Sequence, residues 1–404
     1  MKLFSRSIWI TIAILLLFSC AGNNKTRIPA DQIPKKDLLE EFSVGDDYLK
    51  KFKEQQTQAT QATQAIQVTP VTQSTHMPVP VLPATTNIKS QKLTKPKDNK
   101  RTLTKVKTVK AKEVTKEEIK EVNKFKEVKE VKKVKEVTNT VDNNYPEKYP
   151  DLYKEYDRNS ISVWQKFSPR VFIGEVIEIA VKYFGITCGS VTMKTLPTVR
   201  IGQREAFHLH ALAKSAEFYE SFYAIDDYVE TFVDAKNFTP IKYTLIQRES
   251  KQSIDDLQLF DMEKLKTLYW FKREKNGETS KEEKNEFIPK LLQDSFAVLY
   301  FMRGLPLKIG DVYNIPIVTR AEIWILKATV AEEEELNIKG VKYKALKINA
   351  ETHFPGVLKK RGDIYFWYSN DDLRIPLKFM AKVKIGKVEG ELVKYNNNNL
   401  KKHE

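Results

Sequence analysis

Apolar and polar residues alternate over much of residues 163–395, and this period of two restricts the region to β-strands. The clearest stretch spans residues 375–385, where one face would carry Ile375, Leu377, Phe379, Ala381, Val383 and Ile385. Lysines occupy most of the intervening positions. Because neighbouring side chains of a strand point to opposite faces, the pattern predicts a strand that is packed on one face and wet on the other.

The same alternation recurs at residues 177–183, 207–211 and 324–328, and turn-forming sequences lie between such segments. One helix is predicted at 295–303, with Asp294 as its N-terminal cap and Gly304 in the left-handed conformation after its end. The predicted fold is therefore mostly β. It is an antiparallel curved sheet or open β-barrel-like domain over residues 163–395 with one short helix, followed by a polar tail at 396–404.

The N-terminus has the layout of a bacterial export signal. Lys2 and Arg6 precede an apolar run over residues 8–18, which is too short to cross about 30 Å of hydrocarbon. The sequence Leu-Phe-Ser-Cys at residues 17–20 resembles a lipobox, so residues 1–19 are predicted to be a lipoprotein signal peptide. Lipidated Cys20 would then anchor the protein to a membrane.

Residues 20–162 are predicted to be a disordered tether. Residues 55–75 are rich in Gln, Thr and Ala, and residues 105–137 repeat Lys and Glu around apolar residues spaced by three, which fits no coiled coil. Residues 92–137 contain 17 Lys/Arg against 8 Asp/Glu, whereas residues 163–395 contain 36 against 32. The excess charge therefore lies in the tether. We expect the tether either to contact an anionic envelope polymer or to act as a plain spacer, and we expect no nucleic-acid partner.

Five segments in the C-terminal half resemble a family of exported bacterial proteins, domain of unknown function 3108. They are residues 174–175, 185–189, 227–234, 294–303 and 367–376, and together they cover roughly residues 170–395. The resemblance implies an exported, β-rich domain and no established activity. The long tether departs from a typical member, as does Cys188, where many members have Ala, Gln or a similar residue.

The sequence contains few signals of catalytic chemistry. It lacks a Gly-x-Ser-x-Gly elbow, a phosphate-binding loop and a Gly-x-Gly-x-x-Gly motif, and no cofactor is predicted. His208 and His210 would share one face of a strand, where a carboxylate could complete a metal site; the simpler interpretation is a polar, solvent-facing pair. If Cys20 carries lipid, Cys188 is the only other cysteine and has no disulfide partner. A buried Cys188 is favoured over a reactive thiol.

Aromatic and arginine residues supply the candidate ligand site. Residues 365–368 are four consecutive aromatics, so a strand places two on each face, and one pair could line a groove for an acyl chain or a sugar. Tyr365 and Trp367 are the proposed pair. Arg303 and Arg374 lie in the segments most like the family, where they would pair with Asp227 or Asp372 or bind an anionic ligand.

The sequence therefore predicts a lipid-anchored envelope protein, most simply one on the outer membrane that faces the periplasm. Its domain would be a non-catalytic binding or assembly module for an amphipathic lipid, a glycan or an envelope protein. The alternative is a hydrolase or lyase that acts on an envelope polymer.

Overall fold

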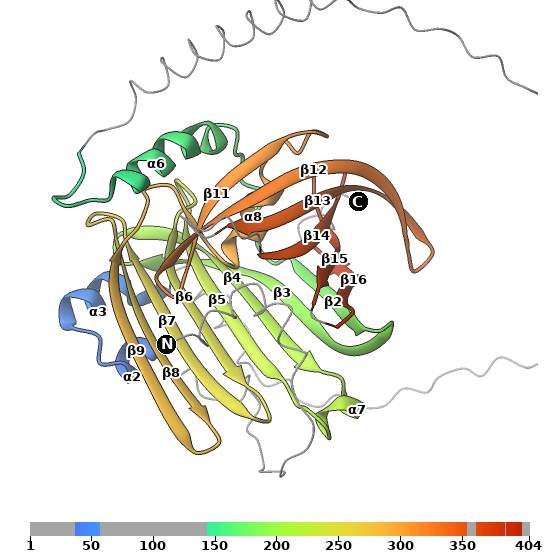
Figure 1. Ribbon diagram of the computed structural model, residues 1–404, viewed down its shortest axis with the longest axis horizontal. Coiled ribbons are helices and arrows are strands. Elements are labelled where there is room, and N and C mark those ends of the chain that lie inside the picture. Colours follow the sequence, from blue (N-terminus) through green and yellow to red (C-terminus); the bar gives the residue numbers. More distant parts are fainter. Residues whose placement is uncertain (1–36, 57–143, 354–360, 384, 398–404) are drawn as a thin grey trace, which may run out of the picture. The chain divides into compact units, whose positions relative to one another are not determined.

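Sixteen strands form one curved sheet in the part of the chain that the computed structural model describes, residues 37–56, 144–353, 361–383 and 385–397 (Figure 1). The strands are β1 (Glu54–Gln56), β2 (Val176–Tyr183), β3 (Ile186–Ile201), β4 (Arg204–Ser215), β5 (Asp226–Asp234), β6 (Pro240–Arg248), β7 (Gln252–Asp261), β8 (Lys266–Lys275), β9 (Glu278–Phe287), β10 (Gln293–Asp294), β11 (Val312–Thr319), β12 (Glu322–Ile338), β13 (Val341–His353), β14 (Arg361–Ser369), β15 (Pro376–Lys382) and β16 (Lys387–Asn396).

Consecutive strands pair in antiparallel hairpins along most of this sheet. β16 pairs with β2, with Val388 opposite Tyr183, so the two ends of the domain meet within the sheet. The strand path begins at β10, which is parallel to β11, and ends at β9, so the sheet is open. The predicted class, a mostly β domain with a curved antiparallel sheet, is confirmed.

The described helices are short and pack on different parts of the sheet. They are α2 (Leu38–Glu41), α3 (Asp46–Phe52), α6 (Asp151–Trp164), α7 (Glu217–Glu220) and α8 (Ala297–Arg303). Among these described segments, none combines the length and apolar character that a membrane-crossing helix requires. We call the face of the sheet that packs against α8 the inner face, and the opposite face the outer face.

The alternating stretch at 375–385 forms a strand over only part of its length. In β15, Leu377, Phe379 and Ala381 are buried, as predicted, and the residues between them are more exposed. The strand ends at Lys382, because Gly386, at a φ of 76°, turns the chain into β16. Ile385 therefore lies in the turn with 67% of its surface exposed, and its predicted place on the core face is wrong.

The predicted helix is present as α8, which begins at Ala297, two residues after the predicted start, and the Asp294 side chain binds the backbone at that end. The Asp294 carboxylate accepts hydrogen bonds from the backbone N–H groups of Phe296 and Ala297 at 2.8 and 2.7 Å. Gly304 has a φ of −81°, so the predicted left-handed conformation is wrong. Glycine is needed there for space, because a Cβ atom would lie 2.3 Å from a ring carbon of Phe167.

Parts of the predicted tether belong to the fold. Helices α2 and α3 carry Leu38, Leu39 and Phe52 into a buried cluster on the outer face of β3–β8, and β1 pairs with β3. At the end of α6, the Trp164 ring lies 4.4 Å from the ring of Phe301 in α8. These apolar side chains bury enough surface to order their segments. The predicted signal at 1–19, Cys20, residues 57–143 of the tether and residues 398–404 of the tail lie outside the described residues.

Candidate ligand-binding cavity

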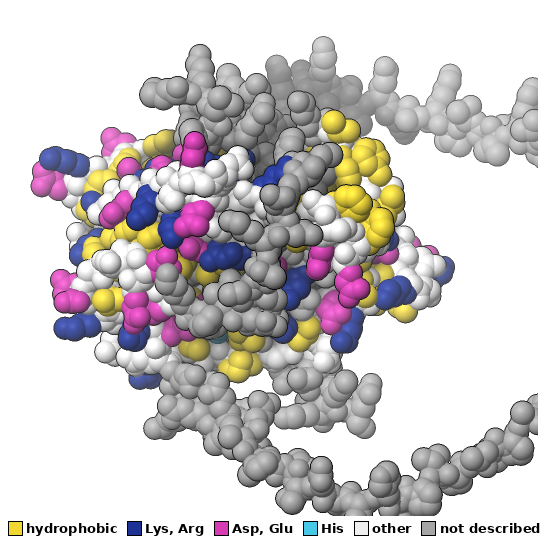
Figure 2. All heavy atoms as spheres, turned by 90° about the horizontal axis from the view of Figure 1, so that it is seen from below, with side chains coloured by type: hydrophobic (Ala, Val, Ile, Leu, Met, Phe, Trp, Pro, Cys, Tyr) yellow, Lys and Arg dark blue, Asp and Glu magenta, His cyan; other side chains and the backbone are white. Residues whose placement is uncertain are grey.

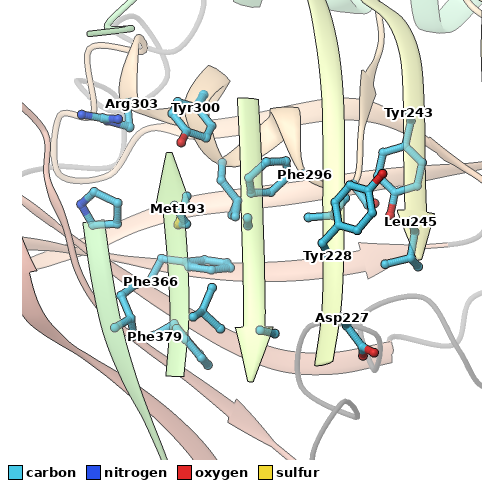
Figure 3. A pocket seen from close by; sticks show the side chains of 18 of the residues that line it. Met193, Asp227, Tyr228, Tyr243, Leu245, Phe296, Tyr300, Arg303, Phe366 and Phe379 are labelled. Atoms are coloured by element: carbon cyan, nitrogen blue, oxygen red, sulfur yellow. The ribbon is translucent and has the colours of Figure 1, made fainter. Parts of the chain in front are cut away.

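A cavity of about 100 Å³ lies between α8 and the inner face of the sheet (Figure 3). Its walls are mainly apolar and include Ile179, Met193, Ala211, Val229, Leu245, Phe296, Leu299, Phe366 and Phe379. Ala211 and Ala213 contribute only methyl groups from β4, which leaves space opposite α8. An apolar space of roughly 150 Å³ accepts a benzene ring, so a cavity of this order holds a small ring or a short length of acyl chain.

A buried ion pair lies at one end of the cavity. Arg303 donates from Nη1 and Nη2 to the two carboxylate oxygens of Glu175, both at 2.7 Å, and each side chain is 1% exposed. Nη2 also donates to the Leu373 carbonyl at 2.9 Å. Burial alone would lower the pKa of Arg303, but its hydrogen bonds and charge interaction with Glu175 raise it, so the guanidinium stays charged.

Two hydrogen-bond donors at this end are not used by the protein. Within the described residues, neither the Tyr300 hydroxyl nor Arg303 Nε has a hydrogen-bond partner, although Thr195 lies beside Tyr300. Burial raises the pKa of Tyr300, so its hydroxyl remains protonated. Figure 3 places Tyr300 and Arg303 side by side. Since unpaired buried donors are costly, they mark a place where a ligand oxygen would be stabilised.

Asp227 lies at the opposite end of the cavity (Figure 3). Its carboxylate accepts hydrogen bonds from the backbone N–H of Arg248 at 2.7 Å and from Gln247 Nε2 at 3.2 Å. Asp227 therefore fixes the start of β5 against β6. The predicted pairing of Arg303 with Asp227 or Asp372 is wrong, because Glu175, at the start of the first predicted strand, holds the arginine.

A polar cluster lies behind Tyr243, a residue of the cavity wall. The Tyr269 hydroxyl donates to Asp256 Oδ2 at 3.2 Å, and Arg320 Nε lies 3.5 Å from the same oxygen. Burial raises the pKa of Asp256 to about 6, although Arg320 and Tyr269 oppose the shift. These three side chains are not part of the cavity lining, and Asp256 and Arg320 act on its wall through their charge interaction with Tyr243.

The run of four aromatics divides between the two faces of β14, as predicted. Phe366 and Tyr368 line the cavity, and the Tyr368 hydroxyl donates to the Leu299 carbonyl of α8 at 3.1 Å. Tyr365 and Trp367, the pair selected from the sequence, do not line it. Trp367 Nε1 instead donates to Glu334 at 2.9 Å on the outer face.

Arg374 lies in the loop between β14 and β15 and has a φ of 48°. It donates to the side-chain oxygen of Asn370 at 3.0 Å and to the Pro306 carbonyl at 3.2 Å. These bonds join the loop to the chain that follows α8. Arg374 is absent from the cavity wall.

The two histidines share one face of β4, as predicted, but that face is not open to solvent. His208 is buried on the outer face, shares a hydrogen bond of 2.6 Å with Glu230 and stacks on Phe232. His210 stacks on Tyr228. Within the described ranges, no three His, Cys, Asp or Glu side chains gather as a metal-ligand set.

Cys188 is buried in the core, in agreement with the favoured interpretation. Its Sγ contacts the Val181 carbonyl at 3.4 Å, and burial raises the pKa of the thiol. A thiol with a raised pKa is a poor nucleophile, because the thiolate is the reactive form.

Sequence reasoning found Arg303 but missed Tyr300, Met193 and the alanines of β4. Tyr300 lies three residues before Arg303, so both project from one side of a helix, and this spacing was the available signal. Met193 and the alanines carry no chemical signature, and only the curvature of the sheet brings them to α8.

The chain resembles one known sequence family and, distantly, some solved structures. The sequence model of a family described as "Protein of unknown function (DUF3108)" matches residues 178–393. No curated protein sequence matches the chain. A β-barrel-like protein of domain of unknown function DUF1849 from Brucella abortus is 11% identical, with a TM-score of 0.38, and the alignment covers 56% of this chain and 98% of that one. LprF from Mycobacterium bovis is 11% identical, with a TM-score of 0.19, over 61% and 94% of the two chains.

Proposed function

This chain belongs to the DUF3108 family of proteins of unknown function, and on that premise we propose that its domain is a non-catalytic binding module for an acyl-chain lipid. The carrying observation is an apolar cavity with two unpaired donors, the Tyr300 hydroxyl and Arg303 Nε, at one end. The apolar walls would take the chain, and the donors would take an oxygen of the head.

The charge at the donor end favours a neutral oxygen. Glu175 already balances Arg303 at 2.7 Å, so a second carboxylate would meet the negative charge of Glu175 in a buried site. An ester carbonyl accepts the same two hydrogen bonds without that repulsion. The proposed ligand is therefore an acyl ester, such as the glycerol ester of a lipid, rather than a free fatty acid.

The carboxylates nearest the two ends of the cavity favour binding over hydrolysis. Glu175 and Asp227 both accept hydrogen bonds from the protein's own groups. We propose that the module works in the bacterial envelope, anchored by lipid on Cys20 to the outer membrane and facing the periplasm. Residues 92–137 would act as a basic tether that contacts an anionic polymer.

Fluorescence titration of the full chain with methyl cis-parinarate tests the proposed ligand. Ala213→Phe would fill the cavity and abolish binding, whereas Leu212→Phe, on the other face of the same strand, would leave it unchanged. Tyr300→Phe would weaken binding about ten-fold by removing one hydrogen bond in an apolar site. Equal affinities of the Ala213→Phe and Leu212→Phe variants, or tighter binding of the free acid than of the ester, would contradict the proposal.

A further inference from the structure

Five large apolar side chains protrude from one end of the sheet, which we call the α7 end. Phe184 and Ile186 belong to the β2–β3 turn and are 64% and 59% exposed, and Ile385 in the β15–β16 turn is 67% exposed. Phe218 in α7 and Phe222 just after it are 73% and 64% exposed. These three phenylalanines are the most exposed aromatic side chains among the large hydrophobic residues of the described part of the chain.

The turns that carry these side chains are joined to one another. The Tyr183 hydroxyl donates to the Ile385 carbonyl at 2.9 Å, which connects the β2–β3 and β15–β16 turns. The backbone N–H of Ala216 donates to the Cys188 carbonyl at 3.0 Å, which holds α7 against the start of β3. Figure 2, a view from below, shows hydrophobic side chains gathered on one side of this face. The five residues therefore form one surface built on three separate turns.

The chemistry of this surface fits a lipid bilayer. Aromatic and aliphatic side chains on separate protruding turns enter a fluid interface independently, without the flat complementary partner that a protein contact needs. Lys182, Lys382 and Lys387 flank the two hairpin turns, and residues 182–187 and 382–387 contain no Asp or Glu, although Lys182 lies 3.3 Å from Glu391 and Lys387 lies 3.1 Å from Glu389 in β16. Basic residues beside apolar tips complement anionic headgroups. The carboxylates Glu217 and Glu220 of α7 limit the depth of insertion to the headgroup layer.

We propose that the α7 end docks onto a bilayer containing anionic phospholipid, with Phe184, Phe218 and Phe222 as the inserting residues. This inference goes beyond the proposed ligand, and only the nearness of a membrane rests on the proposed anchor at Cys20. The cavity reaches Ala213 and Asp227, which pair with each other close to the strand ends that hold α7. Docking therefore brings the end of the cavity at Asp227 next to the lipid.

Vesicle flotation with the full chain tests this surface. The Cys20→Ala variant removes the proposed acyl anchor, so any remaining affinity belongs to the protein surface. We expect it to float with vesicles of phosphatidylglycerol and phosphatidylethanolamine, and less with phosphatidylcholine alone. Adding Phe184→Ser, Phe218→Ser and Phe222→Ser would reduce the bound fraction by about ten-fold or more, because each phenylalanine loses its burial in the interface.

The matched control replaces exposed apolar residues elsewhere. Ile309 and Val341 are 62% and 53% exposed, and serine at both positions is expected to leave flotation unchanged. No flotation of the Cys20→Ala protein, or equal losses in the two sets of variants, would overturn the proposal. So would a concentration-dependent dimer abolished by the phenylalanine substitutions, since the occupant would then be a second copy. Binding of methyl cis-parinarate in solution reports on the cavity separately.

Discussion

Glu175→Gln is the substitution with the largest expected effect on stability. Glu175 and Arg303 are each 1% exposed, and the arginine makes two hydrogen bonds of 2.7 Å to the carboxylate. Glutamine keeps the size of the side chain but removes its charge. The Arg303 guanidinium would then stay buried with only the Leu373 carbonyl and an amide oxygen as acceptors.

The cost follows from the burial of the remaining charge. Removing one partner of a buried ion pair destabilises a protein by about 3–5 kcal/mol, because the other charge is left uncompensated. Tyr395, whose hydroxyl donates to Glu175 Oε1 at 3.0 Å, would also lose a charged acceptor. We therefore expect the free energy of unfolding, measured by urea denaturation at neutral pH, to fall by about 4 kcal/mol.

Two further variants separate this effect from a general loss of packing. The pair Lys182–Glu391 is also an ion pair, at 3.3 Å, but its side chains are 32% and 36% exposed, so Glu391→Gln should cost less than about 1 kcal/mol. The double variant Glu175→Leu/Arg303→Met should regain most of the lost stability, because no unpaired charge is buried. If Glu175→Gln costs no more than Glu391→Gln, the reasoning from buried charge is refuted.

Three further predictions concern other positions. The pKa of Asp256, raised to about 6 by burial, implies that the free energy of unfolding falls by roughly 2 kcal/mol as pH rises from 4 to 6, because the unfolded carboxyl ionises first. Asp256→Asn should flatten this curve in urea titrations, and Asp255→Asn should not. Gly304→Ala should cost about 1–3 kcal/mol in thermal unfolding, since its Cβ would meet a Phe167 ring carbon at 2.3 Å, whereas Gly45→Ala, with nothing within 4 Å, should be neutral. After a carbonate wash, which strips peripheral contacts such as the proposed docking surface, Cys20→Ala should move the protein from the membrane fraction to the soluble fraction of lysed cells, and membrane association that survives the wash would contradict lipid anchoring.

Alternation of apolar and polar residues predicts a strand well where one face of the sheet is exposed to solvent. In β15 the buried and less buried residues alternate as the sequence indicates. The hydrogen bonds from the start of α8 to Asp294 also join residues that are close in sequence, so the sequence predicts them equally well. In β7, by contrast, eight consecutive residues from Ile254 to Asp261 are buried. Both faces of that strand are covered, so its sequence carries no clear period of two.

The candidate site shows a second limit of sequence reasoning. The pattern at 365–368 predicts that two aromatics lie on each face, but it contains nothing that identifies the inner face. That choice depends on the position of α8, whose Leu299 carbonyl binds Tyr368 from 69 residues away in sequence. Glu175 and Arg303 are 128 residues apart, and a single sequence does not indicate which carboxylate an arginine selects.

Residues 38–56 show why the sequence predicts neither the strands buried on both faces nor the face that carries the site. Residues 38–56 look like part of a tether because their apolar residues are few, yet Leu39 and Phe52 are fully buried against the outer face of β3–β8. The same covering makes that face a second core, in which His208 is buried beside Glu230 instead of facing water. Over β14–β16 the outer face carries polar pairs such as Trp367–Glu334 and Lys378–Glu389. Because β3–β8 are packed on both faces, they form a rigid side of the cavity. The space for a ligand lies between α8 and Ala211 and Ala213 of β4, whose small side chains do not reach the helix.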